Sequence, residues 1–262
     1  MDIPCAVGKS GGTTGVRMQR ENLVVVRAGD KSLHPQWLTN GARSWDLAVS
    51  YYGDYPERYK DQYDLLHLYK GPKWEGLADF IAGHRDLVRK YRYVWFPDDD
   101  IFTTAENIDR LFEVCADAGF TVAQPALTRY SYYTWPITRR QRRAIYRRTN
   151  FVEIMAPCFR VETLALFEPT FTLSSSCWGI EWLWWDMAVK ATVARFGIVD
   201  CAAVYHTRPV GSAGSGGATA SPWDEKRKLM DAYKLQETEP RVLGTFPSTW
   251  RQFLSRLLPR EK

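Results

Sequence analysis

Three consecutive aspartates end a short apolar segment, and this feature constrains the fold of the chain most strongly. Residues Tyr93 to Pro97 read Tyr-Val-Trp-Phe-Pro, and Asp98, Asp99 and Asp100 follow directly. A buried strand that ends in carboxylates places negative charge at the carboxyl edge of a sheet, where open α/β folds bind ligands. Two such charges about 4 Å apart repel by roughly 1 kcal/mol in water and by about 4 kcal/mol at a partly buried site. The sequence therefore predicts a cation among these aspartates.

Alternation along an extended backbone divides the three aspartates between two faces. Asp98 and Asp100 are expected on one face and Asp99 on the other. An Asp-x-Asp pair suits a hard divalent ion with oxygen ligands, so we expect Mn²⁺ or Mg²⁺. The alternative is a solvated acidic turn before the next helix.

Strands and helices alternate in the first half of the chain. The predicted strands are Leu23–Arg27, Ser44–Tyr52, Leu65–Tyr69, the segment before the aspartates, and Val122–Pro125. Helical spacing covers Trp74 to about Lys90, and a capping box of Thr103 and Glu106 begins a helix that Gly119 ends. This alternation predicts an α/β fold with a largely parallel sheet and helices on both sides.

The second half of the chain is less regular. Phe151 to Phe159 is predicted as a strand, Trp178 to about Arg195 as a tryptophan-rich helix, and Ile198 to Tyr205 as a strand. Residues 211–220 are rich in glycine and serine, a composition typical of a mobile flap. We expect a flexible lead at 1–21, a single catalytic domain at 22–248 and a C-terminal helix at 249–262. Within the domain, residues 22–125 would form the nucleotide-binding half and 126–248 the acceptor half.

Composition narrows the partners and the compartment. The formal net charge is +5, and six arginines lie within residues 139–148. Such a cluster could bind a phosphate-bearing ligand or form a solvated basic helix face, and no zinc-finger or RNP-like signature supports nucleic acid. Five scattered cysteines without a Cys-x-x-Cys argue against a disulfide scaffold and against structural zinc. We therefore expect a cytoplasmic protein.

The C-terminal segment carries apolar residues at helical spacing with arginines between them. A basic amphipathic helix of this kind could lie peripherally on the inner membrane face, although docking onto the protein's own core is the commoner explanation. No stretch of the sequence reaches transmembrane length.

Four further side chains could take part in chemistry. His206 ends an apolar strand and could complete the coordination of Mn²⁺, and Arg208 nearby could contact a phosphate. Glu181 falls in the first turn of the tryptophan-rich helix, where the helix dipole favours the ionised form that a general base requires. Glu153 is an acid in an otherwise apolar segment and could meet an acceptor hydroxyl or pair with an arginine. Each of these residues could also have an ordinary structural role.

Taken in order, these motifs resemble those of a known family. They are the three aspartates, Val152-Glu-Ile-Met-Ala-Pro157, Trp178-Gly-Ile-Glu181, and Gly197-Ile-Val-Asp200 followed by His206. The chain resembles an uncharacterised family of glycosyltransferase-like proteins over roughly residues 22 to 211. The pattern is related to GT-A nucleotide-sugar transferases of the Fringe and β-1,3-galactosyltransferase type.

The resemblance implies a GT-A-like, Rossmann-related fold with a smaller mixed acceptor-side half. It also implies a divalent metal and a nucleotide-diphosphate-sugar donor, with a carbohydrate or lipid-linked acceptor. By position, Asp98, Asp100 and His206 match the metal site, and Glu181 matches the catalytic base of inverting members. Further donor contacts are predicted for Asp98, Asp99, Arg208, Arg27 and Lys73, and acceptor contacts for Glu153, Trp178 and Trp182. The family usually has aspartate where this chain has Glu181, which is one methylene longer.

Two other functions use the same residues. A metal-dependent phosphohydrolase or nucleotidyltransferase would need the same acidic site. A carbohydrate- or nucleotide-binding module without turnover would bind the same ligands and form no product.

Overall fold

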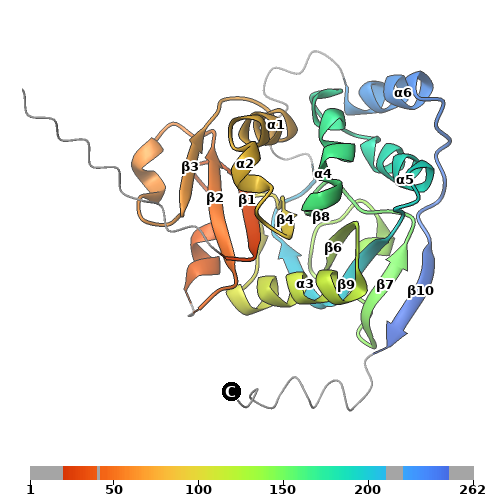
Figure 1. The fold of residues 1–262 in the computed structure, drawn as a ribbon, viewed down its shortest axis with the longest axis horizontal. Coiled ribbons are helices and arrows are strands. Elements are labelled where there is room, and N and C mark those ends of the chain that lie inside the picture. The colour runs from red at the N-terminus through yellow and green to blue at the C-terminus, as the bar shows by residue number, and fades with distance from the viewer. Residues whose placement is uncertain (1–19, 40–41, 211–220, 248–262) are drawn as a thin grey trace, which may run out of the picture.

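A computed structural model describes residues 20–39, 42–210 and 221–247 of the chain (Figure 1). The strands of this part form a ten-stranded sheet in the order β10-β7-β9-β6-β8-β4-β1-β2-β3, with β5 paired to β9 off that path. The predicted flap at 211–220 and the predicted helix at 249–262 lie outside the described residues. No helix in the described part combines the length and the apolarity that crossing a membrane requires.

The first half of the sheet is parallel. Its strands are β1 (Asn22–Ala28), β2 (Trp45–Tyr51), β3 (Leu65–Leu68) and β4 (Tyr93–Trp95). Short 3-10 helices follow β1 and β2, η1 (His34–Leu38) and η2 (Pro56–Tyr59). Every residue of β1 and β2 is buried, as expected for strands covered on both faces.

The second half of the sheet is mixed. Its strands are β6 (Val122–Leu127), β7 (Ala144–Thr149), β8 (Cys158–Arg160), β9 (Phe196–His206) and β10 (Val242–Pro247). β6 runs parallel to β9, while β8 joins β4 to β6 by antiparallel pairing on both sides. The α/β class predicted from the sequence is confirmed. The predicted division after residue 125 falls inside β6, so the two halves share one sheet.

Helices cover both faces of the sheet. On one face, α3 (Ala105–Ala118) lies against β9 and β6, and its Ile108, Leu111 and Phe112 belong to one hydrophobic core with side chains of β1, β2 and β4. The other face is covered by α1 (Lys73–Gly83), α2 (Arg85–Val88), α4 (Val161–Phe167) and α5 (Ile180–Lys190). The remaining elements are β5 (Ile101–Phe102), η3 (Pro136–Thr138), η4 (Glu168–Thr172) and α6 (Pro222–Ala232).

Two helix predictions need correction. The helix predicted from Trp74 to Lys90 is two helices, because the chain leaves helical geometry at His84 after Gly83, a weak helix former. The N-cap of α3 is Thr104 instead of Thr103, since the Thr104 hydroxyl accepts the Asn107 N–H. Gly119 ends α3 in the left-handed conformation, as predicted.

The strand predicted at Phe151–Phe159 is wrong over most of its length. Only β8, from Cys158, forms a strand there. The preceding backbone is bound by side chains instead: the Glu153 N–H donates to Gln124 Oε1, and Lys73 Nζ donates to the carbonyls of Ile154 and Met155. Pro157 also removes a backbone donor.

The arginine-rich segment does not form a basic helix. Residues 139–143 precede β7, whose alternation buries Arg147 at 1% exposure and leaves Arg148 exposed. Arg147 is paired with Asp200 through two contacts of 2.9 and 3.0 Å. Arg147 therefore forms an ion pair in the core, and the other five arginines of the cluster are exposed.

Candidate metal centre and donor site

The aspartate turn, residues Asp98–Asp100, connects β4 to β5 where the two halves of the sheet meet. The Asp98 N–H donates to the Met155 carbonyl at 3.0 Å. The Asp100 carbonyl accepts from the backbone N–H of Thr207 at 3.1 Å and from its hydroxyl at 2.8 Å. Segments from the second half of the chain therefore hold the turn on both sides.

The side chains of Asp98, Asp100 and His206 form one cluster. One ligand atom from each lies within 4.8 Å of the other two, and Asp100 Oδ2 is 3.2 Å from His206 Nε2. The pairing of β5 with β9 sets Ile101 opposite His206 and so brings the histidine to the turn. Two carboxylates and one imidazole suit Mn²⁺ well, and the residues present fit a divalent ion.

The tautomer of His206 is fixed by the backbone. Its Nδ1 lies 2.9 Å from the carbonyl of Tyr132, and a carbonyl can only accept, so Nδ1 carries a proton. Nε2 is thereby directed at Asp100 and available to a metal, an arrangement common for metal-ligating histidines. Burial alone would lower the pKa of His206, but the hydrogen bond and charge of Asp100 raise it above its ordinary value.

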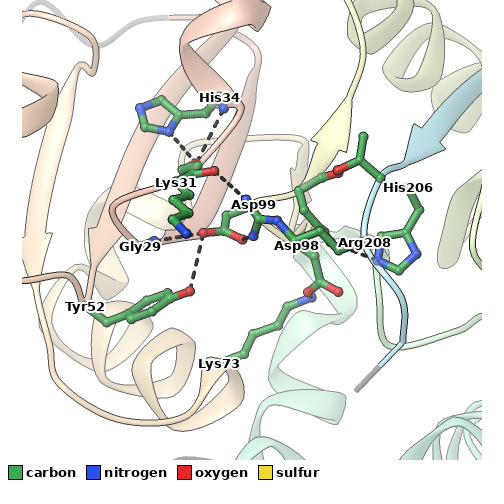
Figure 2. A network of polar contacts seen from close by, with 12 residues as sticks. Gly29, Lys31, His34, Tyr52, Lys73, Asp98, Asp99, His206 and Arg208 are labelled. Carbon is green, nitrogen blue, oxygen red and sulfur yellow. Dashed lines mark hydrogen bonds and ion pairs between the residues drawn. The ribbon is translucent and has the colours of Figure 1, made fainter. Parts of the chain in front are cut away.

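Lys73 is the cation that contacts Asp98. This residue begins α1, and its Nζ donates to Asp98 Oδ1 at 2.6 Å (Figure 2). The same Nζ donates to the carbonyls of Ile154 and Met155 at 2.9 and 2.7 Å. All three ammonium protons are therefore used. Burial raises the pKa of Asp98, and the charge of Lys73 opposes that rise. The predicted donor contact of Lys73 remains a prediction.

Asp99 points away from the cluster, toward the loop after β1. Its Oδ2 accepts the Gly29 N–H at 2.9 Å and lies 3.4 Å from the Tyr52 hydroxyl, while Oδ1 accepts from Arg208 at 3.1 Å (Figure 2). Burial raises the pKa of Asp99, and the Gly29 N–H opposes that rise. Through Arg208, which also donates to the Lys31 carbonyl, Asp99 ties the β1 loop to the end of β9.

Glu181 is buried at the start of α5, with 4% of its surface exposed. Its Oε2 accepts the N–H of Gly179, the N-cap residue, whose φ of 97° is accessible to glycine without strain. Burial raises the pKa of Glu181 to about 7, against the opposing effect of backbone N–H groups. A carboxyl group with that pKa can take up a proton near neutral pH.

Glu153 is the second buried acid, with 4% of its surface exposed. Its Oε2 has no hydrogen-bond partner among the described residues, and the side chain of Thr134 lies nearby. Burial, followed by the charge of Glu181, raises the pKa of Glu153 to about 8. The two glutamates therefore influence each other's ionisation.

Three predicted contact residues have well-defined surroundings. Arg27 is 3% exposed, and its guanidinium donates to the carbonyls of Ser50, Tyr69 and Gly71. Trp182 is 6% exposed, and its indole N–H donates to the Thr238 carbonyl. Trp178 is partly exposed, and its ring lies edge-on against Trp223. The donor and acceptor roles of these residues remain predictions.

The sequence reasoning missed several groups of the site. The Tyr132 carbonyl and the Gly29 N–H are backbone groups that carry no sequence signal. Tyr52 had one, since it is the last residue of the predicted strand Ser44–Tyr52 in the parallel half, and ligand-facing residues collect at the ends of such strands.

The sequence matches a family model over most of its length. A family model described as "Protein of unknown function (DUF707)" matches residues 66–254, which is well over half of the chain. No curated protein matches the sequence.

Solved structures resemble this chain at low identity. TarS 1–349 of S. aureus, crystallised with UDP-GlcNAc, is 12% identical with a TM-score of 0.48, and the match covers 82% of this chain and 65% of that one. GalNAc-T7, crystallised with UDP, GalNAc and Mn²⁺, is 12% identical with a TM-score of 0.50, and the match covers 81% and 48%. The chain thus spans less than two thirds of either protein. The likeness is one of GT-A fold, and it does not extend to a Fringe-type specificity.

Proposed function

We propose that this chain, which belongs to the family described as "Protein of unknown function (DUF707)", is a metal-dependent glycosyltransferase. It would move a sugar from a nucleotide-diphosphate-sugar donor to an acceptor hydroxyl, with inversion at the anomeric carbon. One observation carries the proposal. The ligand atoms of Asp98, Asp100 and His206 lie within 4.8 Å of one another, in a GT-A-like fold that also buries two carboxyl groups of raised pKa.

The donor would lie between the aspartate turn and the loop after β1. Asp98, Asp100 and His206 would hold a Mn²⁺ or Mg²⁺ ion, which supplies positive charge for the departing diphosphate. Asp99 and Arg208 keep the β1 loop against the turn, so the surface that receives the nucleotide is already assembled. The nucleotide base and the donor sugar are left open.

Glu181 is the proposed general base. It takes the proton of the acceptor hydroxyl as that oxygen bonds to the anomeric carbon, and the bond from this carbon to the diphosphate breaks with its electron pair. At the end of the step the proton is on Glu181 and the negative charge on the nucleoside diphosphate. A pKa of about 7 suits this exchange near neutral pH. Glu153 is proposed to contact the acceptor.

Calorimetry with UDP tests the metal site. We expect UDP to bind in Mn²⁺ and its affinity to fall by about 10²-fold in EDTA or in Asp100→Asn, since the charge that neutralises the diphosphate is then lost. Asp86→Asn is the control, because that side chain is 97% exposed on α2. Equal affinity with and without the metal would refute the proposed metal dependence.

Product analysis separates the transferase from the other two functions. Incubation with UDP-sugars and a mixture of acceptors should yield a new glycoside. Free phosphate or a nucleoside monophosphate as the main product would indicate a phosphohydrolase. Saturable binding without any product would indicate a binding module.

A further inference from the structure

The aromatic loop, residues 128–139 between β6 and the segment before β7, borders the metal centre. The Ser131 hydroxyl accepts the His206 N–H at 3.2 Å, and the Tyr132 N–H donates to the His206 carbonyl at 3.2 Å. The Thr134 side chain lies near enough to Glu153 to oppose the rise of its pKa. The loop therefore contacts the metal cluster and lies beside one of the two buried acids.

Large aromatic side chains of this loop are exposed. Tyr130 is 77% exposed, Tyr132 46% and Tyr133 39%. Leaving three neighbouring rings in water forgoes the burial that such side chains usually gain. Exposed tyrosines combine a flat apolar face with a hydroxyl, so they can cover the apolar face of a sugar ring and donate hydrogen bonds to its hydroxyls.

The base of the loop is held in place by Arg147. Its guanidinium donates to the Ile137 carbonyl at 2.8 Å and to the Arg139 carbonyl at 2.9 Å, and Asp200 balances its charge. The Arg140 N–H donates to the Leu127 carbonyl at 2.9 Å, which closes the loop on β6. A loop that is already ordered loses little conformational entropy when a ligand binds.

Positive charge is interleaved with the rings. Residues 120–152 contain seven arginines and neither aspartate nor glutamate. All of these arginines except Arg147 are exposed. The guanidinium carbon of Arg129 lies 5.8 Å from the centroid of the Tyr130 ring, and that of Arg139 lies 5.3 Å from the centroid of the Tyr133 ring. Such a surface attracts ligands that are both ring-shaped and negatively charged.

We propose that the aromatic loop binds the acceptor, and that the acceptor is an acidic carbohydrate that carries carboxylate, sulfate or phosphate groups. The inference rests on the proposed transferase function, because a carbohydrate bound there would extend from the loop toward Glu153 and the metal cluster. The tyrosine rings contact the sugar faces, and the exposed arginines pair with the acidic groups.

Short oligosaccharides test the proposal by calorimetry on the full chain. The probes are tetrasaccharides of galacturonic acid, of a sulfated heparin type, and of neutral glucose. We expect the neutral probe to bind at least about 10-fold more weakly than the better acidic probe at low salt, and added salt to weaken the acidic probes. The comparison of the two acidic probes identifies the acidic group. Equal affinity for the neutral probe would overturn the inference, and so would tighter binding of a single-stranded RNA of equal charge.

A triple variant tests the arginines. Arg139→Ser, Arg140→Ser and Arg142→Ser together should weaken the better acidic probe by about 10-fold or more. The matched control removes Arg89, Lys190 and Arg227, whose side chains are 68%, 71% and 69% exposed on other helices. An equal loss in the control would overturn the inference, because it would show that net charge alone attracts the probe.

Tyr130→Ala with Tyr133→Ala tests the rings and leaves Tyr132, whose backbone contacts His206, in place. We expect weaker binding of the acidic and the neutral probe alike, while Mn²⁺-dependent UDP affinity and the melting temperature stay at the wild-type values. Unchanged probe binding in this variant would overturn the role of the loop. Failure of every nucleoside diphosphate tried in Mn²⁺ to bind the wild-type protein, with the acidic probe still bound, would refute the transferase and leave the carbohydrate site.

Discussion

The aspartate turn and the Glu153–Glu181 pair are both acidic, but their carboxyl groups have different partners. Each aspartate has a basic side chain within 3.2 Å, namely Lys73, Arg208 and His206 in turn. Glu181 has only backbone N–H groups within bonding distance in the described structure, and Glu153 leaves one oxygen without a partner there. Burial therefore raises the pKa of the glutamates to about 7 and about 8.

The carboxyl groups of these two regions are therefore suited to different tasks. The carboxylates with basic neighbours can exchange such a neighbour for a metal ion. The carboxyl groups whose pKa burial raises to about 7 and about 8 can gain or lose a proton near neutral pH, so they can exchange one with a substrate. Substitutions at Glu181, Glu153 and Asp99 can separate these two tasks.

The largest expected effect belongs to Glu181. Glu181→Gln should lower the transfer rate by about 10³-fold while UDP affinity in Mn²⁺ stays within about 3-fold, since an amide cannot accept the acceptor's proton. The measurement is initial-rate product formation, together with calorimetry. Glu162→Gln is the control, because that carboxylate is 83% exposed on α4. Near-normal turnover would transfer the role of base to another residue.

The next effect is on stability and belongs to Glu153. Its folded-state pKa of about 8 lies above the ordinary value of 4.5, so the folded protein retains a proton that the unfolded chain has already lost. The free energy of unfolding should therefore fall as pH rises from about 4.5 to about 8, by on the order of 3 kcal/mol from this group. In Glu153→Gln that part of the decline should vanish. Urea unfolding at pH 5 and pH 8.5 measures it, and identical pH slopes in both proteins would contradict the assignment.

The smallest expected effect belongs to Asp99. Asp99→Asn keeps an oxygen for the Gly29 N–H and loses the charge that pairs with Arg208, so UDP affinity should fall by about 5-fold, corresponding to about 1 kcal/mol. Asp54→Asn is the control, because it removes a surface ion pair with Lys70 whose partners are 81% and 67% exposed. A loss as large as that of Asp100→Asn would mean that Asp99 also acts at the metal.

The strands of the parallel half could be predicted closely from the sequence. Leu23–Arg27 lies within β1, because a run of apolar β-branched residues suffices to specify a buried strand. Leu65–Tyr69 differs from β3 by one residue. Phe151–Phe159 has the same composition and is mostly not a strand. Its carbonyls are bound by Lys73, a residue far away in the sequence, and no local pattern contains that fact.

The candidate site was predictable in its residues but not in its partners. The spacing of Asp98 and Asp100 indicated a metal pair, and the end of an apolar strand indicated His206. Nothing in the sequence indicated that the Tyr132 carbonyl orients this histidine or that Arg208 reaches Asp99, because backbone groups and long flexible side chains carry no positional pattern.

The sequence by itself determined which segments are buried, where carboxylates follow a strand, and where glycine ends a helix. These are local properties, set by polarity and by the geometry of neighbouring residues. Only the tertiary structure decided that β5 pairs with β9 and so brings Asp100 to His206, and that burial without partners raises the pKa of Glu153 and Glu181. Such contacts depend on strand order and on solvent exclusion by segments distant in the chain, which are properties of the folded molecule as a whole.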